Sequence, residues 1–241
     1  MKVIYRISNG SYKKERFDFI DKEICLRNFV ACGYGLPKST DLIILADRCD
    51  QFTLNMIYRR ALIKPVEINV GNGAGSWKYA ALYAMGNFPK DEIVYFVEDD
   101  YLHRSGFIQI LKEGMEIADY VTLYDHPDKY LDADKGGNAY VAGGGEVTRV
   151  YRTKSTHWKL TNSTTMTFAT TVKTLEEDWD VWEKATETSH PNDFGAFIEL
   201  AHKQRHLVSP IPAYSTHCEI AWGSPGIDWK ELAHGYSKDS L

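Results

Sequence analysis

Three consecutive acidic residues, Glu98, Asp99 and Asp100, follow the apolar run EIVYFV at 92–97. Such a run is typical of a strand buried on both faces of a sheet, and ligands of open α/β sheets bind at the carboxyl ends of the strands. Adjacent carboxylates repel one another, and Mg²⁺ or Mn²⁺ removes that cost while bridging them to phosphate oxygens. The triplet therefore favours metal-assisted chemistry on a phosphorylated substrate over the alternative, an acidic start to a solvated loop.

A second candidate is the glycine-rich stretch GNGAG at 71–75, after the apolar run VEINV at 66–70. A glycine loop between a strand and a helix can hold a cofactor, with an acid about 20 residues later on the ribose. That pattern allows an S-adenosylmethionine-dependent methyltransferase using this loop and Glu98. In such folds the loop follows the first strand, whereas two strand–helix units precede it here. Because any sharp turn favours glycine, we interpret 71–75 as a tight turn close to a ligand.

The elements that must position these residues alternate along the first half of the chain. Apolar runs and helical spacing predict strands at 3–8, 42–46, 66–70, 92–97 and 120–124, and helices at about 21–32, 50–62, 76–85 and 106–118. This rhythm is the pattern of a mostly parallel sheet with helices on both faces.

The second half has a different composition. Residues 125–146 are rich in Asp, Gly and Lys and predict a long, mobile loop of the kind that forms lids, with Asp132-Ala133-Asp134 on its surface. The remaining expectations are antiparallel strands at 147–153 and 163–171, helices at about 175–187 and 193–205, and irregular structure at 211–229. Trp158, Trp222 and Trp229 suit either a sugar-binding platform or core packing.

Composition narrows the class of protein. The 241 residues are 44% hydrophobic and 25% charged, as expected for a globular protein with a substantial core. The net charge of −5 argues against nucleic acid as a partner. The N-terminal stretch MKVIYRISNG turns polar too early for a signal peptide. No apolar run approaches the ~20 residues of a membrane span. Four cysteines without a CxxC pair indicate reduced thiols, and we expect a cytoplasmic protein.

In order and spacing, these features resemble the GT-A glycosyltransferases, particularly the small single-domain enzymes similar to family 2 in bacteria and large DNA viruses. YFVEDDY at 95–101 looks like their DxD-type motif, with Glu98 in place of the first Asp. RISNG at 6–10, which contains Ser8, stands where such enzymes meet the nucleotide. LIILAD ends in Asp47, where the family recognises base or ribose.

Two later segments extend the resemblance. HPNDFGAFIEL at 190–200 is similar to the family's acidic motif at a helix start, whose last acid is the catalytic base, and this maps to Asp193. YSTHCE at 214–219 places His217 where many members supply a histidine to the metal. The Arg-Asn pair common after the third strand is missing, and Lys78 is the expected substitute at a donor phosphate.

The resemblance implies a GT-A fold: a Rossmann-like, mostly parallel sheet with helices on both faces and a small antiparallel portion on the acceptor side. We find no internal repeat or linker and expect one domain over 1–241, with a nucleotide-sugar-binding half at 1–124 and an acceptor-binding, catalytic half at 125–241.

The activity implied is metal-dependent hexosyl or pentosyl transfer from a nucleoside-diphosphate sugar to a carbohydrate or other hydroxyl acceptor, with inversion. Asp193 is the expected base; an Asp at a helix start is also a common N-cap, which leaves a structural role open. Asp100 and His217 are the expected ligands of Mn²⁺ or Mg²⁺. The residues expected at the donor, or at the metal's waters, are Ser8, Asp47, Lys78, Glu98 and Asp99.

Other functions stay open at this point. They are the methyltransferase already described and a non-catalytic module that binds sugar nucleotides or carbohydrates. A sugar-nucleotide pyrophosphorylase shares parts of the fold, but its N-terminal glycine-rich, basic signature is not supplied convincingly by RISNGSYKKER at 6–16.

Overall fold

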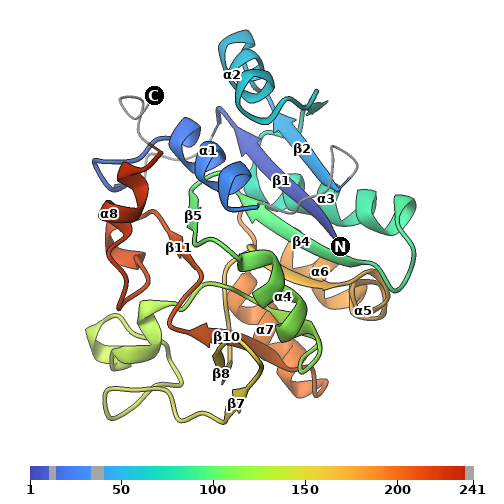
Figure 1. The fold of residues 1–241 in the computed structure, drawn as a ribbon. Coiled ribbons are helices and arrows are strands. Elements are labelled where there is room, and N and C mark those ends of the chain that lie inside the picture. The colour runs from blue at the N-terminus through green and yellow to red at the C-terminus, as the bar shows by residue number, and fades with distance from the viewer. Residues whose placement is uncertain (11–14, 34–40, 237–241) are drawn as a thin grey trace.

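The computed structural model describes residues 1–10, 15–33 and 41–236, so residues 11–14 of the stretch compared with a pyrophosphorylase signature lie outside the described residues (Figure 1). The strands are β1 (Lys2–Ser8), β2 (Leu42–Asp47), β3 (Val66–Ile68), β4 (Ile93–Glu98), β5 (Tyr101–His103), β6 (Tyr120–Val121), β7 (Val150–Arg152), β8 (His157–Thr161), β9 (Phe168–Thr171), β10 (Leu207–Ile211) and β11 (Ser215–His217). The α-helices are α1 (Lys22–Cys32), α2 (Gln51–Ala61), α3 (Gly73–Asn87), α4 (Phe107–Met115), α5 (Val172–Glu177), α6 (Trp179–Ala185), α7 (Asp193–His202) and α8 (Trp229–His234). Short 3₁₀ helices are η1 (Pro127–Tyr130), η2 (Ala133–Lys135) and η3 (Ile220–Trp222).

The described strands form a large central sheet in the order β3-β2-β1-β4-β9-β6-β10-β8-β7. The strands before the acidic triplet pair in parallel, and their register sets Ser8 opposite Asp47 and Arg6 opposite Glu98. Strand β9 is antiparallel to both β4 and β6, and β10 runs parallel to β6 but antiparallel to β8. The expected fold class is confirmed: a parallel sheet core with antiparallel strands added from the second half of the chain.

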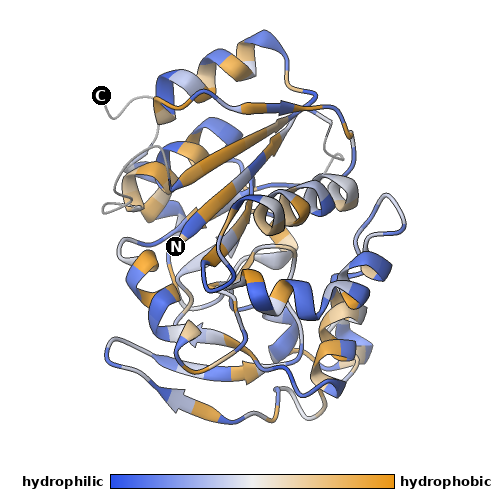
Figure 2. Ribbon diagram, turned by 90° about the vertical axis from the view of Figure 1, so that its right-hand side faces the viewer, coloured by the Kyte–Doolittle hydropathy of each residue, from blue (hydrophilic) through white to orange (hydrophobic). Residues whose placement is uncertain are grey.

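Helices cover both faces of the sheet, and each face has its own apolar core. Leu26 of α1, Ile57 of α2 and Leu111 of α4 are buried on one face. On the other face, Trp77 of α3 packs with Trp182 of α6. Figure 2 shows apolar residues concentrated on the long central strands between the two helical layers. Because helices cover both faces there, a ligand is expected at the carboxyl ends of the parallel strands.

A second, two-stranded sheet pairs β5 with β11, antiparallel, with His217 opposite Tyr101. The backbone N–H of Cys218 also donates to the carbonyl of Asp100 at 2.9 Å. This small sheet carries the last acid of the triplet and the late histidine to the same place, although they lie far apart in the sequence (Figure 1).

Some element boundaries differ from those predicted. Helix α3 begins at Gly73 rather than Ser76, because the side chain of Asn72 caps it by accepting from the N–H of Gly75 at 2.8 Å. Strand β8 was not predicted. Residues 211–229 were expected to be irregular, but they contain β11 and η3, and α8 begins at the last of them. Trp158 and Trp229 belong to apolar core clusters, which leaves neither as an open sugar platform.

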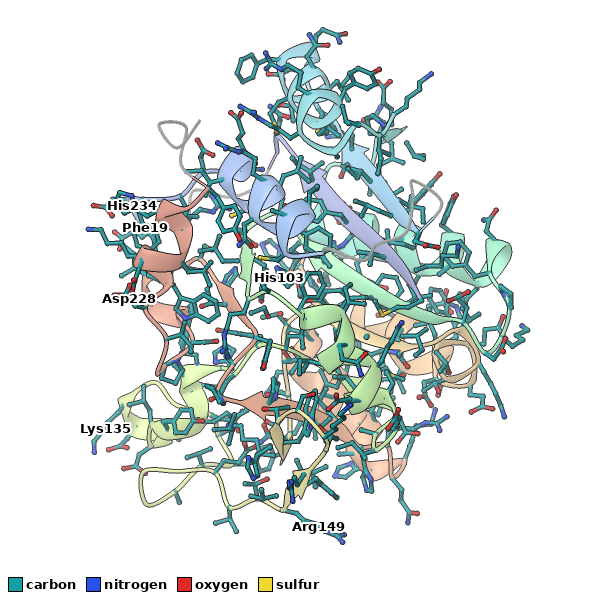
Figure 3. The ribbon with its side chains drawn as sticks, viewed as in Figure 1. Phe19, His103, Lys135, Arg149, Asp228 and His234 are labelled. Carbon is teal, nitrogen blue, oxygen red and sulfur yellow. The ribbon has the colours of Figure 1, made fainter. Side chains whose placement is uncertain are left out.

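Figure 3 labels one buried and one exposed side chain: His103 lies inside the molecule beside α1, and Lys135 lies at its periphery. All four cysteines are free thiols. In the part of the chain that the structure describes, no helix has both the length and the apolar character needed to cross a membrane.

Candidate functional site

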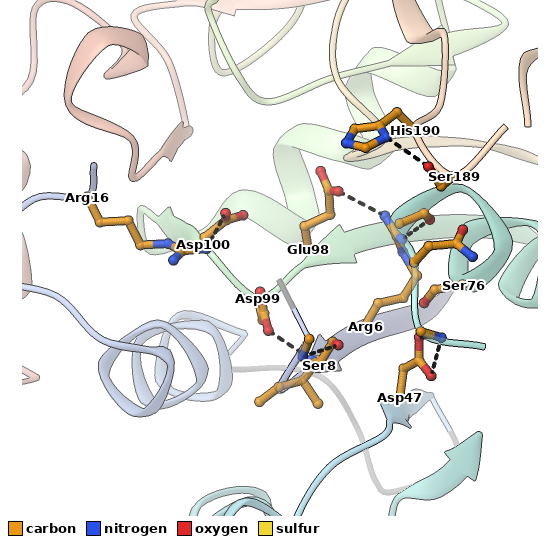
Figure 4. Close-up of a pocket in the computed structure, with 15 residues that line it drawn as sticks. Arg6, Ser8, Arg16, Asp47, Ser76, Glu98, Asp99, Asp100, Ser189 and His190 are labelled. Carbon is orange, nitrogen blue, oxygen red and sulfur yellow. Dashed lines mark hydrogen bonds and ion pairs between the residues drawn. The ribbon is translucent and has the colours of Figure 1, made fainter. Parts of the chain in front are cut away.

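A cavity of about 240 Å³ lies at the carboxyl ends of β1, β2 and β4, beside the start of α3 (Figure 4). Its walls include Ser8, Asp47 and the acidic triplet 98–100, together with the turn at 71–73 and residues 189–190. Five of the residues singled out from the sequence are therefore brought into one cavity, at the sheet edge where open α/β folds bind ligands.

At one end of the cavity, Oδ2 of Asp100 lies 3.3 Å from Nε2 of His217. The same Oδ2 atom is 3.2 Å from the guanidinium of Arg16. On the other side of the imidazole, Nδ1 of His217 is 3.6 Å from Glu219, an arrangement that holds the ring with Nε2 toward Asp100. The two residues expected to bind a metal thus meet, with a cation already beside them.

The donor atoms at this point fit a partly substrate-built metal site. Among the described residues, no group of three or more His, Cys, Asp or Glu side chains gathers in a way that could hold a metal ion. Mg²⁺ and related ions are commonly bound by one or two carboxylates, with substrate phosphates and water completing the shell. Asp100 and His217 would supply two ligands of such a shell, and the imidazole favours Mn²⁺ over Mg²⁺.

The second acid, Asp99, organises the loop after β1. Its Oδ2 accepts a hydrogen bond from the backbone N–H of Ser8 at 3.0 Å and lies 2.7 Å from the ammonium of Lys22. That ammonium also donates to the carbonyl of Ser8. Burial raises the pKa of Asp99, and the nearby Lys22 opposes that rise. Asp99 and Lys22 together fix the cavity wall at Ser8.

The first acid, Glu98, faces a cation that the sequence interpretation missed. The guanidinium of Arg6 lies 3.3 Å from Glu98, and its Nη1 donates to the carbonyl of Gly73 at 3.2 Å. Arg6 is only 6% exposed; its Nη2 is the atom paired with Glu98, whereas its buried Nε has no hydrogen-bond partner. One signal was available, since Arg6 is the single charged residue within the otherwise apolar strand VIYRIS. Figure 4 shows the ion pair of Arg6 and Glu98 as a dashed line.

Asp47 ties the glycine-rich turn to the end of β2. Its carboxylate accepts hydrogen bonds from the backbone N–H groups of Val70, at 2.8 Å, and of Gly71, at 3.0 and 2.8 Å. Gly71 has φ of +82°, and a Cβ there would meet the guanidinium of Arg48 at 2.2 Å. Gly71 and Asn72 thus form a tight turn before α3 that lines the cavity, and the positive φ favours glycine at residue 71.

Lys78 does not line this cavity. Its ammonium is 3.0 Å from Glu183 of α6 and 5.9 Å from the ring of Trp179. Ser76 lines the cavity instead, and two positions along a helix is a rotation of roughly 200° about its axis. The expected contact of Lys78 with a donor phosphate stays a prediction, whereas Arg6 is a cation that does line the cavity.

Asp193 is the first residue of α7, but the helix cap is its neighbour. The side chain of Asn192 accepts from the N–H of Gly195 at 3.0 Å, whereas Oδ1 of Asp193 accepts from the adjacent N–H of Phe194 at 2.8 Å. Asp193 does not line the cavity itself. It follows residues 189–190, which do, and the carbonyl of Ser189 accepts from the N–H of Ala74 in α3.

Comparison with known proteins concerns the fold. No protein-family model and no curated protein matches this sequence. A 4-diphosphocytidyl-2C-methyl-D-erythritol synthase from Anaerococcus prevotii is similar in structure at 12% identity and a TM-score of 0.51, with 98% of this chain and 96% of that chain covered.

Two glycosyltransferase-related structures are more distant. TarS 1–349 from S. aureus matches 87% of this chain at 12% identity and a TM-score of 0.46, and the chain spans 58% of that structure's length. The galactosyltransferase LgtC, in complex with donor and acceptor sugar analogues, matches at 9% identity and a TM-score of 0.42, with 87% and 73% covered. At these identities, likeness extends to the fold alone. The sheet order, the second small sheet and the similarity at a TM-score of 0.51 together give this chain a GT-A-like, nucleotide-diphospho-sugar transferase fold.

Proposed function

We propose that this chain transfers a sugar from a nucleoside-diphosphate sugar to an acceptor hydroxyl, with a divalent cation and with inversion. The observation that carries the proposal is the meeting of Asp100 and His217 at 3.3 Å, at one end of a cavity that also contains a buried cation. Carboxylate and imidazole next to a positively charged wall suit a diphosphate that leaves with its charge neutralised.

The donor would bind along the cavity. Ser8 and Asp47 stand at the end formed by β1 and β2, where the nucleoside would bind against a wall fixed by the hydrogen bonds of Asp47 and Asp99. Arg6 and Glu98 would contact the diphosphate or sugar, since both line the cavity and Arg6 brings a positive charge to its wall. A Mn²⁺ or Mg²⁺ ion held by Asp100 and His217 would supply Lewis-acid stabilisation of the leaving diphosphate.

Asp193 would accept the proton of the attacking hydroxyl. It is an acid in the first turn of α7, at the positive end of the helix dipole, and a carboxylate is a common general base. One base, with no second nucleophile assigned, corresponds to a single displacement and hence to inversion. Capping does not explain Asp193, because Asn192 performs that role.

A thermal-shift screen tests the proposal. The purified protein is heated with UDP, GDP, dTDP or S-adenosylhomocysteine, each with and without Mn²⁺, since a ligand that binds only the folded state raises the melting temperature. We expect one nucleoside diphosphate to stabilise the protein in a Mn²⁺-dependent manner and Asp100→Ala to weaken that effect. Stabilisation by S-adenosylhomocysteine alone would overturn the proposal and revive the methyltransferase.

The second candidate is nucleotidyl transfer from a nucleoside triphosphate to a sugar phosphate or similar alcohol phosphate. It is favoured by the similarity, over nearly the whole of both chains, to the diphosphocytidyl-methylerythritol synthase. The two reactions release different products. Identifying the released product distinguishes them. Nucleotidyl transfer yields pyrophosphate from the triphosphate, whereas sugar transfer yields a nucleoside diphosphate from the sugar nucleotide.

A non-catalytic binding module is the third possibility. It predicts nucleotide-dependent stabilisation without turnover of any sugar nucleotide, in the wild type and in Asp193→Asn alike. Release of nucleoside diphosphate by the wild type and its loss in Asp193→Asn would exclude the module.

A further inference from the structure

An exposed pair of aromatic rings lies next to Asp193. The rings of Tyr140 and Phe194 stack at 6.0 Å between centroids, with an angle of 24° between their planes. Tyr140 remains 67% exposed, while Phe194 is partly buried and directly follows Asp193 at the start of α7. A large aromatic side chain held this far out in water exposes an apolar face whose burial would be favourable.

Short stretches of chain connect the pair to residues of the donor cavity. His190 lines that cavity, as Glu98 does, and Figure 4 shows its ring above the side chain of Glu98. Phe194 is four residues further along, which limits its distance from His190 to roughly 14 Å even in an extended chain. On the other side, residues 162–163 anchor the segment that carries Tyr140, and Thr167, a few residues further on, donates to Glu98 at 3.3 Å.

Buried polar groups hold Tyr140 in this position. The side chain of Asn138 accepts from the N–H of Tyr140 at 3.1 Å and donates to Asp128 at 3.2 Å and Asn162 at 3.1 Å. Lys129, which is 1% exposed, lies 3.0 Å from Asp128 and donates to Ser163 at 2.8 Å. Burying an ammonium is costly unless it is paired and hydrogen-bonded, and this network has no part in the proposed chemistry. Its evident effect is to hold the glycine-rich segment that carries Tyr140 next to the start of α7.

We propose that Tyr140 and Phe194 form the platform on which the acceptor binds, and that this acceptor is a carbohydrate. The proposal rests on the proposed function. One face of a pyranose ring presents C–H groups that stack on an aromatic ring, while the hydroxyls at its edge remain free to reach a base. Asp193, the base of the proposed function, directly precedes Phe194 in α7, which ties the platform to the group that would take the proton.

The size and surroundings of the platform select this class of acceptor. Two rings are far smaller than the ~1,000 Å² that a stable protein partner requires. A lipid acceptor would need a larger apolar surface, whereas Phe194 directly follows the polar residues Asn192 and Asp193. A single sugar ring matches both the area and the polar border.

Ligand-observed NMR with simple glycosides tests the inference. Methyl β-glucoside, methyl β-galactoside and methyl α-mannoside are titrated into the wild type with the stabilising nucleoside diphosphate and Mg²⁺, which, unlike Mn²⁺, is not paramagnetic. We expect saturable binding of at least one glycoside, weakened about tenfold in Tyr140→Ala and largely retained in Tyr140→Phe. Tyr58→Ala is the matched control, because Tyr58 is 60% exposed on α2 and lies outside the cavity.

Each result separates this inference from the proposed function. If the nucleoside diphosphate stabilises every variant equally but no glycoside binds the wild type, the carbohydrate platform is wrong and the donor site stands. Equal glycoside affinity in the wild type and Tyr140→Ala also overturns the platform. If no nucleoside diphosphate stabilises the wild type, the proposed function fails and the platform inference fails with it.

Discussion

Oδ2 of Asp100 and Nε2 of His217 lie 3.3 Å apart because the antiparallel pairing of β5 and β11 sets Tyr101 opposite His217. The contact is made by backbone register, so removing either side chain should leave the small sheet intact. The proposed metal binding therefore depends on both side chains, whereas the fold of the small sheet depends very little on either.

We therefore expect Asp100→Ala to abolish the Mn²⁺-dependent part of the thermal shift given by the nucleoside diphosphate. Loss of the carboxylate removes one of two protein ligands, and turnover should fall by at least about 100-fold, or roughly 2.7 kcal/mol of transition-state stabilisation. The measurements are melting temperature with and without Mn²⁺, and release of nucleoside diphosphate.

Asp134→Ala is the matched control for that variant. It removes an exposed acid from Asp132-Ala133-Asp134, an Asp-x-Asp sequence on the surface of the segment 125–146. We expect wild-type metal response and turnover. If Asp134→Ala lost the metal response while Asp100→Ala kept it, the metal would have to be assigned to the surface segment.

Arg6 and Glu98 should behave as an interdependent pair. Arg6→Gln and Glu98→Gln each remove one charge from a contact of 3.3 Å, and each should cost about 1–3 kcal/mol of unfolding free energy, because the remaining charge loses its partner. The double variant should lose less than the sum of the two, with a coupling of about 0.5–3 kcal/mol. Urea unfolding of the four proteins measures this coupling.

The same variants report on donor binding. We expect Arg6→Gln to weaken binding of the sugar nucleotide about tenfold or more, because the substitution removes a positive charge from the cavity wall. Arg60→Gln is the control, since it breaks a contact of 2.6 Å with Glu23 that joins α2 to α1 outside the cavity. Unchanged donor affinity in Arg6→Gln would contradict our assignment of this residue.

The first half of the fold could be predicted because it follows periodic patterns. Apolar runs of strand length alternate with helical spacing, and Asp21 and Asp50 cap α1 and α2 by accepting from backbone N–H groups three residues later. The position of the acidic triplet after β4 followed from the same patterns. Strand β8 was missed because HWKLT carries two basic residues among apolar ones, and its burial comes from pairing with β7 and β10.

The site residues could be predicted only where position in the chain determines which side chains reach the cavity. Lys78 was chosen because it follows the third strand, but the rotation of α3 turns Ser76 toward the cavity and Lys78 toward α6. Arg6 was not chosen, because no spacing rule indicates which residue of a central strand end meets the cavity. Contacts between side chains on different elements depend on the register of those elements, and a single sequence does not record that register.

Buried His103 gives a prediction about pH. Burial lowers the pKa of His103 to about 3, whereas an unfolded histidine has a pKa near 6.5. As pH falls below about 6.5, the unfolded state binds a proton that the folded state does not, so stability declines until the folded pKa is reached. The decline should be up to about 1.4 kcal/mol per pH unit. Urea unfolding between pH 7 and pH 4 measures this slope.

His103→Phe is the reference for that slope. The ring would stay packed against Phe29 and Phe107, and the loss would be the hydrogen bond of 2.8 Å with the hydroxyl of Tyr95. We expect the variant to be less stable at pH 7 but to lose stability more slowly than the wild type as pH falls. Parallel slopes for the two proteins would show that other groups control the acid response.

The adjoining residues Asn192 and Asp193 allow the structural and chemical roles at the start of α7 to be separated. Asn192 caps the helix, so Asn192→Ala should cost about 1 kcal/mol of unfolding free energy and leave the turnover number close to that of the wild type. Asp193→Asn keeps the size of the side chain but removes its basicity, so turnover should fall by about 100-fold to 10,000-fold while nucleotide binding and melting temperature change little. Steady-state release of nucleoside diphosphate, measured beside the thermal shift, distinguishes the two effects. If Asp193→Asn turns over as the wild type does, the base must be another group, and His190, which lines the cavity beside Ser189, is the next to test.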